Sequence, residues 1–359
     1  MIIRSDTMPK IGAGHVIRCL ALAQAWKKGG GNVTFACQFM NEVIQNRIIN
    51  SGMDLLGMAT PSADLENPEQ FLLVLEKLKA RHGHNHCLVT LDGYHFGEDY
   101  QKSIREAGYR LLVIDDINHL PYYHASVLLN PNIHADSLIY HCDQDTSLLL
   151  GPRYVLLLEE FRLGRDRRRE TQQVASRILV TLGATDLKNQ TIKTIRALKK
   201  IDVVTLDISI ILGPTNPNGA EIKRELNNFP HRVHVHINVY NMQEFMSKSD
   251  IAISAGGSTC WEMAFMGLPN VIIALSQDQQ SIAQGLAEKG ISINLGWYES
   301  VSEDQIAQAL KELIFDHKTR SAMSLKGQTL IDGRGTERVI KHLISDQKFL
   351  VPSKRSLAT

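Results

Sequence analysis

Short apolar runs alternate with segments of helical spacing along the first part of the chain. The apolar runs predict strands at residues 1–4, 33–37, 87–92, 111–115 and 127–130. The spacing between them predicts helices near residues 15–28, 42–50, 68–79 and 97–106. Such alternation of strands and helices favours a parallel sheet with helices on both faces.

A polar and charged stretch at residues 159–176 interrupts this alternation and shows no core pattern. We therefore predict a linker at residues 161–174. Its basic run, residues 165–169, includes Asp166 and precedes Glu170. A solvated surface run is a better interpretation of it than a contact with phosphate or RNA.

The alternation then restarts, and the predicted strands are residues 178–182, 204–212, 233–239, 251–254 and 271–275. The predicted helices are residues 190–199, 220–228, 242–248, 258–266, 281–289 and 305–315, with a last helix after 332–335 and a frayed tail beyond 348. The expected fold class is α/β, with two Rossmann-like, doubly wound domains at residues 1–160 and 175–345. Such domains bind ligands at the carboxyl ends of their strands, here facing a cleft.

Composition changes this picture little. The chain has 359 residues, 43% hydrophobic and 21% charged, with a formal net charge of +1. No bulk field favours nucleic acid, and no apolar stretch approaches a membrane span, so we expect neither partner. Five scattered cysteines without a CxxC pair fit a reducing cytosol, and we expect a cytoplasmic protein.

The most informative segment follows the apolar run at residues 251–253. The pair Gly256 and Gly257 precedes Ser258 and Thr259, which open a segment of helical spacing. A strand, a glycine-rich turn and a helix N-terminus direct backbone N–H groups at one place and bind phosphate. Glu262, one turn into the helix, is a candidate acceptor for a ribose diol. Many such turns bind nothing, but the combination predicts a nucleotide diphosphate site that also includes Ser254.

A second glycine-rich loop follows the first strand and contains Gly12 and Gly14 before His15. It lacks the full GxGxxG fingerprint, since Ile17 stands where a small residue is needed, so a dinucleotide cofactor is disfavoured. The positive end of a helix dipole favours a neutral imidazole, and His15 is therefore a candidate general base. A capping or solvent-facing histidine is the alternative.

Polar residues also follow the predicted strands of the first half, where a doubly wound sheet binds ligands. Capping of the next helix is the alternative role for residues at these positions. The candidates for substrate binding are Gly12 and Gly14 of the glycine-rich loop together with Asp6, Asp92, Tyr94, Asp115, Asp116 and Asn130.

Histidines alternate at residues 82, 84 and 86 and again at 234 and 236, which places each set on one face of an extended segment. No carboxylate or cysteine completes a ligand set at a recognisable spacing, so we expect no metal and no cofactor.

Together these segments resemble a known family. The motifs are IGAGHVIRCLALA (11–23), VIDD (113–116), LLNPN (128–132), GPRY (151–154), LGATD (182–186), SAGGSTCWE (254–262) and DGRG (332–335). They look like the UDP-2,4-diacetamido-2,4,6-trideoxy-β-L-altropyranose hydrolases of pseudaminic acid biosynthesis, which resemble GT-B glycosyltransferases. The resemblance implies UDP held mainly by the second domain, with Gly183 and Asp186 at its nucleotide cleft, and a catalytic histidine at His15. Two positions depart from the family pattern, Leu158 and Ala184.

The resemblance implies metal-independent hydrolysis of a UDP-sugar at the anomeric C–O bond, with inversion. UDP is a good leaving group, and His15 would remove a proton from the attacking water. A GT-B glycosyltransferase that moves the sugar to an acceptor is the main alternative, and a nucleotide-sugar sensor without catalysis is a third.

Overall fold

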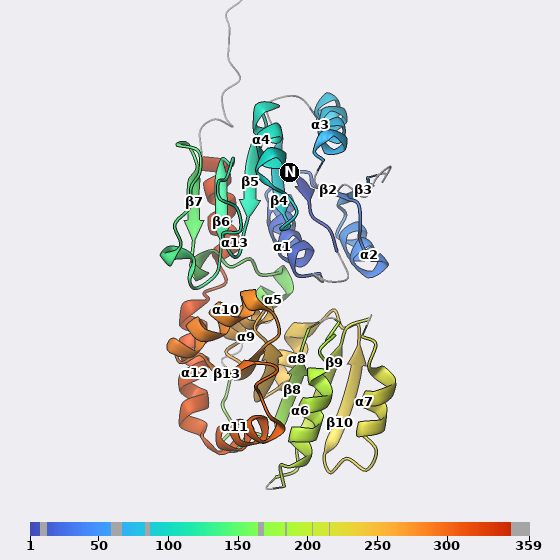
Figure 1. Ribbon diagram of the computed structural model, residues 1–359, viewed down its shortest axis with the longest axis vertical. Coiled ribbons are helices and arrows are strands. Elements are labelled where there is room, and N and C mark those ends of the chain that lie inside the picture. Colours follow the sequence, from blue (N-terminus) through green and yellow to red (C-terminus); the bar gives the residue numbers. More distant parts are fainter. Residues whose placement is uncertain are drawn as a thin grey trace, which may run out of the picture.

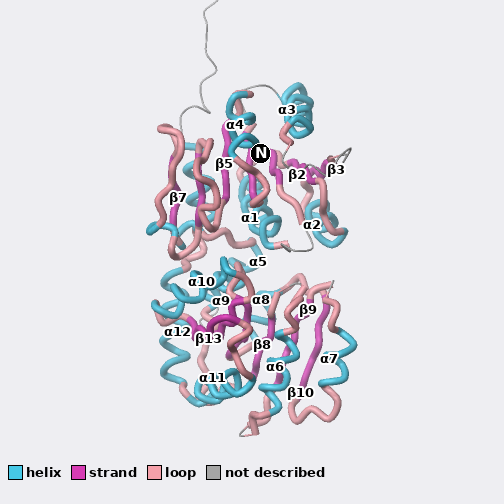
Figure 2. Tube along the Cα trace, viewed as in Figure 1, coloured by secondary structure: helices cyan, strands magenta, loops and turns pink. Residues whose placement is uncertain are grey.

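The computed structural model describes residues 1–7, 13–58, 67–82, 87–163, 169–183, 185–202, 204–214 and 216–345. They form two α/β units, one above the other in Figure 1, each built on its own parallel sheet. Figure 2 shows the strands of each unit gathered between helices. The expected fold class, two Rossmann-like domains in the GT-B arrangement, is confirmed.

The first sheet has the strand order β3-β2-β1-β4-β5-β6-β7, and every neighbouring pair is parallel. Its strands are β1 Ile2–Arg4, β2 Thr34–Cys37, β3 Asp54–Gly57, β4 Leu88–Asp92, β5 Arg110–Ile114, β6 Val127–Asn130 and β7 Ser147–Leu150. The accompanying helices are α1 Gly14–Lys28, α2 Glu42–Asn50, α3 Glu69–His82 and α4 Glu98–Glu106, with 3-10 turns η1 Ala135–Ser137 and η2 Pro152–Tyr154. The central strands β1, β4 and β6 are buried along their whole length, because helices cover both faces.

The second sheet has the order β10-β9-β8-β11-β12-β13, again entirely parallel. Its strands are β8 Arg177–Thr181, β9 Asp207–Leu212, β10 Arg232–Ile237, β11 Ile251–Ala255, β12 Asn270–Ala274 and β13 Ser292–Trp297. Its helices are α6 Gln190–Lys199, α7 Gly219–Glu225, α8 Met242–Lys248, α9 Thr259–Met266, α10 Gln277–Glu288, α11 Glu303–Phe315 and α12 His317–Leu330. In both sheets the order reverses beside the first strand of the unit, the position at which doubly wound folds bind ligands.

Three strands and one long helix do not follow from the apolar pattern. The strands β3, β7 and β13 are all at sheet edges, where one flank meets solvent and the sequence needs no continuous apolar run. Helix α12 packs on α9 through a small residue, Gly327, at which a Cβ would lie 2.9 Å from the Ala264 carbonyl oxygen. Its buried face also includes the polar Arg320 and Ser324, so it has no apolar stripe to detect.

The connection between the units is more ordered than its composition indicates. Residues 159–163 form the short helix α5, Glu159–Leu163, and Phe161 is only 2% exposed. Burial of one such side chain contributes about 1.5–3 kcal/mol. Arg169 is not a solvated residue, because its guanidinium donates to the carbonyl oxygens of Met246 and Ser249 at the end of α8. The prediction that this stretch contributes nothing to the core is therefore wrong for Phe161, and the prediction of a solvated basic run is wrong for Arg169. Residues 164–168 lie outside the described part.

The last helix, α13 Gly335–Ser345, returns to the first unit and packs against α1 (Figure 1). Gly335 makes this approach possible, since a Cβ there would overlap the carbonyl oxygen of Val155. Val339 and Leu343 are fully buried on the same helix. The chain thus crosses between the units twice, and α13 packs with the first unit although it falls within the range 175–345 expected for the second domain.

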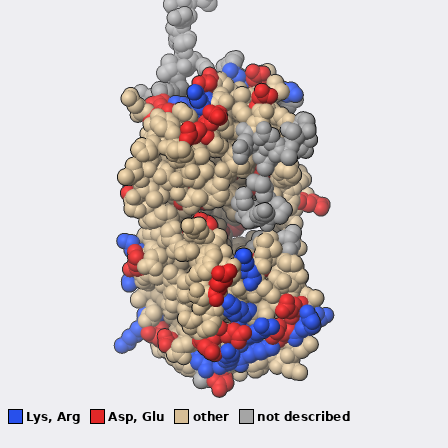
Figure 3. Space-filling view, viewed as in Figure 1, with Lys and Arg blue, Asp and Glu red and all other residues tan. Residues whose placement is uncertain are grey.

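None of the described helices has the length and apolar character needed to cross a membrane. On the face seen in Figure 3, acidic and basic side chains are interspersed and gather towards the outer ends of both units, most densely in the second.

Candidate active site

The helix N-termini that follow the two predicted glycine-rich loops lie close together at the boundary between the units. A Cβ built on Gly14, the first residue of α1, would lie 3.8 Å from the Oγ of Ser258, the N-cap residue of α9. Neither N-cap residue, Ala13 or Ser258, caps its helix with a side chain. Two uncapped helix N-termini therefore converge, and their N–H groups and dipoles make this place suited to an anion.

His15 lies in the first turn of α1 and is buried, at 8% exposure. Its Nδ1 is 2.5 Å from Oδ1 of Asp92, the last residue of β4. A carboxylate only accepts hydrogen bonds, so Nδ1 is the donor to Asp92, and in a neutral imidazole the lone pair is then on Nε2. Nη2 of Arg18 also lies 3.0 Å from Nδ1, but it is itself a donor and forms no hydrogen bond with a protonated nitrogen. Among the described residues, no polar contact of His15 involves Nε2.

Arg18 completes this arrangement from the next turn of α1. Its Nε and Nη2 donate to Oδ2 and Oδ1 of Asp92 at 2.5 and 2.6 Å, and Nη1 pairs with Asp116. Burial alone raises the pKa of Asp92, but the charges and hydrogen bonds of Arg18 and His15 outweigh it and lower that pKa to about 2. Asp92 therefore stays ionised and holds the imidazole in one orientation.

Tyr94 covers the other side of the imidazole. Its ring stands at 90° to that of His15, with centroids 5.0 Å apart, and its hydroxyl lies 3.4 Å from Oδ2 of Asp116. Asp116 in turn accepts from Nδ2 of Asn132 at 3.2 Å. His15, Asp92, Tyr94 and Asp116, predicted separately, are thus brought together.

Asp6 is also buried, but its carboxylate is occupied within the protein. Oδ1 accepts from the backbone N–H groups of Gln38 and Phe39 at 2.7 and 3.0 Å, and Oδ2 pairs with Arg4 and His95. Burial raises the pKa of Asp6, yet the hydrogen bond from His95 and the charge of Arg4 lower it overall. These contacts join the ends of β1 and β2 and leave little of the carboxylate for a ligand.

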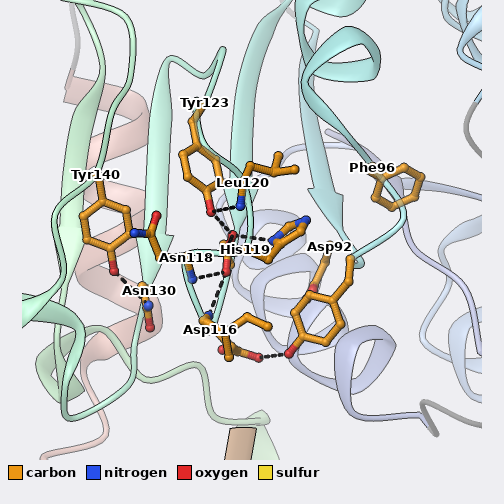
Figure 4. A network of polar contacts seen from close by, with 12 residues as sticks. Asp92, Phe96, Asp116, Asn118, His119, Leu120, Tyr123, Asn130 and Tyr140 are labelled. Carbon is orange, nitrogen blue, oxygen red and sulfur yellow. Dashed lines mark hydrogen bonds and ion pairs between the residues drawn. The ribbon is translucent and has the colours of Figure 1, made fainter.

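Asp115 is likewise saturated. Its Oδ1 accepts from the N–H groups of Ile117 and Asn118 at 2.8 and 2.9 Å, and its Oδ2 accepts from Nδ1 of His119 at 2.7 Å and from the hydroxyl of Tyr123. Figure 4 shows His119 and Tyr123 turned towards the same place. Asp115 therefore organises the loop after β5.

Asn130 ends β6 and organises the following turn. Its Oδ1 accepts from the N–H of Asn132 at 3.0 Å, and its Nδ2 donates to the hydroxyl of Tyr140 at 2.9 Å (Figure 4). The turn places Asn132 against Asp116.

In the second unit, the loop after β11 differs from the expectation in one detail. The N–H of Gly256 is already bonded to Oε1 of Gln279 at 3.1 Å, and the same oxygen accepts from Leu275 at 3.0 Å. A Cβ at Gly256 would lie 2.8 Å from the backbone oxygen of Gln279, so only glycine fits. Gly256 is therefore a packing position and not a free phosphate donor.

The backbone N–H groups of the three residues after Gly256 remain available to a phosphate. Gly257 and Thr259 are half-buried, Ser258 is exposed, and their backbone N–H groups form no hydrogen bond with any described residue. Ser254 lies fully buried beneath them, next to Cys260. Three consecutive free amides at an uncapped helix N-terminus match the donors that a phosphate requires.

Glu262 lies in the first turn of α9, and burial raises its pKa to about 8. The charge of Arg47, from α2 of the first unit, acts in the opposite direction, and that of Glu160 adds to the increase. Arg47 and Glu160 form an ion pair with each other. No described residue hydrogen-bonds to the Glu262 carboxyl group, so it is available to a ligand.

Gly183 has a left-handed φ of +92° with open space around it. Asp186 instead caps α6, because its two oxygens accept from the N–H groups of Gln190 and Thr191 at 2.8 Å each. Burial nevertheless raises its pKa. Gly12 and Ala184 lie outside the described residues.

Three residues that the sequence did not single out contribute to the site, namely Arg18, Asn132 and Gln279. Arg18 is three residues after His15 and therefore shares its helix face, a spacing that could have revealed it. The partners of Asn132 and Gln279 come from loops whose approach no local pattern encodes.

Among the described residues no group of three or more histidines, cysteines, aspartates or glutamates is arranged to hold a metal ion. His234 and His236 stack on β10 with ring centroids 6.4 Å apart, and residues 84 and 86 lie outside the described part.

The chain is similar to known proteins in sequence and in fold. Residues 177–338 match the glycosyltransferase family 28 C-terminal domain. A UDP-2,4-diacetamido-2,4,6-trideoxy-β-L-altropyranose hydrolase of Campylobacter jejuni is 25% identical over 298 residues, which cover 82% of this chain and 98% of that one. The predicted resemblance is confirmed. Both matches support an enzyme of the glycosyltransferase-like class.

An uncharacterized protein of Methanocaldococcus jannaschii is 26% identical over 77% of this chain, but the match spans only 56% of that protein's length. Among solved structures, MurG of Acinetobacter baumannii superposes with a TM-score of 0.66 at 16% identity, covering 96% of this chain and 98% of that chain. At this identity the superposition shows the GT-B fold alone.

Proposed function

We propose that the chain hydrolyses a UDP-linked diacetamido-trideoxy sugar at the anomeric C–O bond and releases UDP and the free sugar for nonulosonic (pseudaminic) acid synthesis. The observation that carries the proposal is the position of His15. Its imidazole is fixed through Nδ1, its Nε2 is free, and it lies where the N-termini of α1 and α9 converge. The hydrolase name of the Campylobacter relative supports the choice of substrate.

In this mechanism the diphosphate binds at the amides of Gly257, Ser258 and Thr259, where the dipole of α9 stabilises the charge that develops on leaving UDP. The ribose diol binds Glu262. Charge stabilisation by helix N–H groups does not require a metal ion, so the proposed reaction is metal-independent.

The attacking water loses its proton to Nε2 of His15 while the bond between the anomeric carbon and the diphosphate oxygen breaks. Asp92 stabilises the imidazolium that forms, and Arg18 keeps Asp92 ionised before the reaction. A single displacement of this kind inverts the anomeric centre. Tyr94 and Asp116 line the sugar side, whereas we assign Asp6, Asp115 and Asn130 to positioning the loops, since internal contacts occupy them.

The test is incubation with the UDP-linked diacetamido-trideoxy altrose in ¹⁸O-water, with mass spectrometry of both products. The expected result is one ¹⁸O in the free sugar and none in UDP, because water attacks carbon and not phosphorus. Label in UDP would contradict the proposed bond cleavage.

A second candidate is a glycosyltransferase that transfers the sugar to an acceptor, favoured by the family 28 match of residues 177–338. His15 would then deprotonate an acceptor hydroxyl. Release of UDP that depends on an added acceptor, with no free sugar formed, would favour this reaction over hydrolysis.

A further inference from the structure

Tyr94 is held between two imidazoles. On one side it meets His15 at 5.0 Å between ring centroids, and on the other it meets His119 at 5.4 Å with the planes at 70°. Among the described residues, the hydroxyl of Tyr94 has one long contact, 3.4 Å to Asp116. Ring contacts therefore fix the orientation of Tyr94 more than its hydrogen bond does.

His119 is well suited to act as the outer support. Its Nδ1 is 2.7 Å from Oδ2 of Asp115, its side chain is 17% exposed, and its ring also meets Tyr123 at 6.4 Å. It thus repeats, one strand along the sheet, the arrangement in which Asp92 holds His15. The loop that bears it is fixed by the N–H bonds to Asp115 already described.

We propose that His119 is a positioning residue for catalysis, which holds the ring of Tyr94 against His15 so that Nε2 stays directed at the attacking water. This inference rests on the proposed role of His15. No atom of His119 needs to touch the substrate. Small displacements of a catalytic group reduce turnover strongly, so loss of this support affects kcat more than KM.

The chain offers two substitutions that separate the ring of His119 from its hydrogen bond. His119→Gln keeps an N–H donor for Asp115 but removes the ring. His119→Phe keeps a ring against Tyr94 but removes the donor. The second change leaves Asp115 with hydrogen bonds from the backbone of Ile117 and Asn118 and from Tyr123, so its carboxylate remains satisfied.

The matched control is His124→Gln. His124 is another histidine of the same segment paired with an aspartate, at 3.0 Å from Asp143, and its ring meets Tyr122 instead of Tyr94. This variant is expected to show unchanged turnover.

The experiment measures kcat and KM for UDP-sugar hydrolysis together with the melting temperature. His119→Gln is expected to lower kcat about tenfold with KM nearly unchanged, and His119→Phe to recover most of that loss. In a double-mutant cycle, His119→Gln should cost nothing further once Tyr94→Ala has removed the ring, because both changes break one support.

Wild-type kcat in His119→Gln, equal losses in the Gln and Phe variants, or additive losses with Tyr94→Ala would each overturn the inference. If His119→Gln does not fold, the Phe variant and its combination with Tyr94→Ala still decide the matter. His15→Ala distinguishes this outcome from failure of the proposed function, because full activity in that variant would show that His15 is not the general base.

Discussion

Asp92→Asn tests the centre of the proposed mechanism. The side chain of Asp92 is fully buried, accepts from Arg18 and His15, and also lies 3.4 Å from the Cys19 thiol. An asparagine amide has nearly the same shape but can donate to Nδ1 of His15. The imidazole would then carry its proton on Nε2, where it cannot accept one from water.

The substitution is expected to change both kcat and the free energy of unfolding. Loss of a general base costs about 10²–10⁴-fold in kcat. Folding also lowers the pKa of Asp92 from 3.8 to about 2, which corresponds to about 2 kcal/mol of stability. Because the folded-state pKa is the lower one, this stabilisation is present at neutral pH and disappears as the pH falls from about 4 towards 2.

The assay combines UDP release at saturating substrate, calorimetry of UDP binding, and urea unfolding at pH 7. UDP affinity is expected to stay close to wild type, since the amides of α9 are untouched. The control is Asp6→Asn, which alters an equally buried strand-end carboxylate whose partners are Arg4, His95 and backbone amides. It should lose stability but retain turnover. A kcat for Asp92→Asn within tenfold of wild type would refute the reasoning.

Three further predictions follow from the same geometry. His15→Ala should reduce turnover at least about 100-fold while leaving UDP binding intact by calorimetry, and a near-normal rate would remove His15 from the mechanism. Glu262→Gln should raise the melting temperature of the ligand-free protein above wild type at pH 8.5 but not at pH 4.5. Burial raises the Glu262 pKa to about 8, so the folded protein bears a growing cost of ionising this group between those two pH values. The same variant should bind UDP more weakly, and an unchanged affinity would exclude a ribose contact. Gly285→Ala should lower kcat/KM, because a Cβ at Gly285 on α10 would overlap Ile133 of the first unit. Adding Ile133→Ala to the same chain should restore kcat/KM. A fully active Gly285→Ala variant would show that this contact does not determine how closely the units approach.

The elements that carry the site could be predicted from the sequence because they are central and buried. The strands β1, β4 and β11 are apolar runs, and the helices that follow them show a face of regular spacing. The edge strands β3, β7 and β13 escaped the same reasoning, since a half-exposed strand needs no apolar run.

Within the site, residue type and position at a strand end were enough to select His15, Asp92 and Glu262. They were not enough to separate ligand-facing carboxylates from internal ones. Asp6, Asp115 and Asp92 follow strands in the same way, yet Asp115 binds residues of its own loop, whereas the roles of Asp6 and Asp92 depend on partners 30 or more residues away, Gln38 and His15. Distant contacts of this kind leave no local signal in a single sequence.

The return of α13 to the first unit has a consequence for synthesis of the chain. Helix α1 leaves the ribosome early, but the helix that covers its outer face is encoded more than 300 positions later, at Gly335–Ser345. The nascent first unit therefore waits with that face uncovered while the whole second unit is translated, although domains commonly fold in order from the N-terminus. Translation arrested after α12 would yield two sheets and an unfinished first unit, a species exposed to chaperone binding and proteolysis.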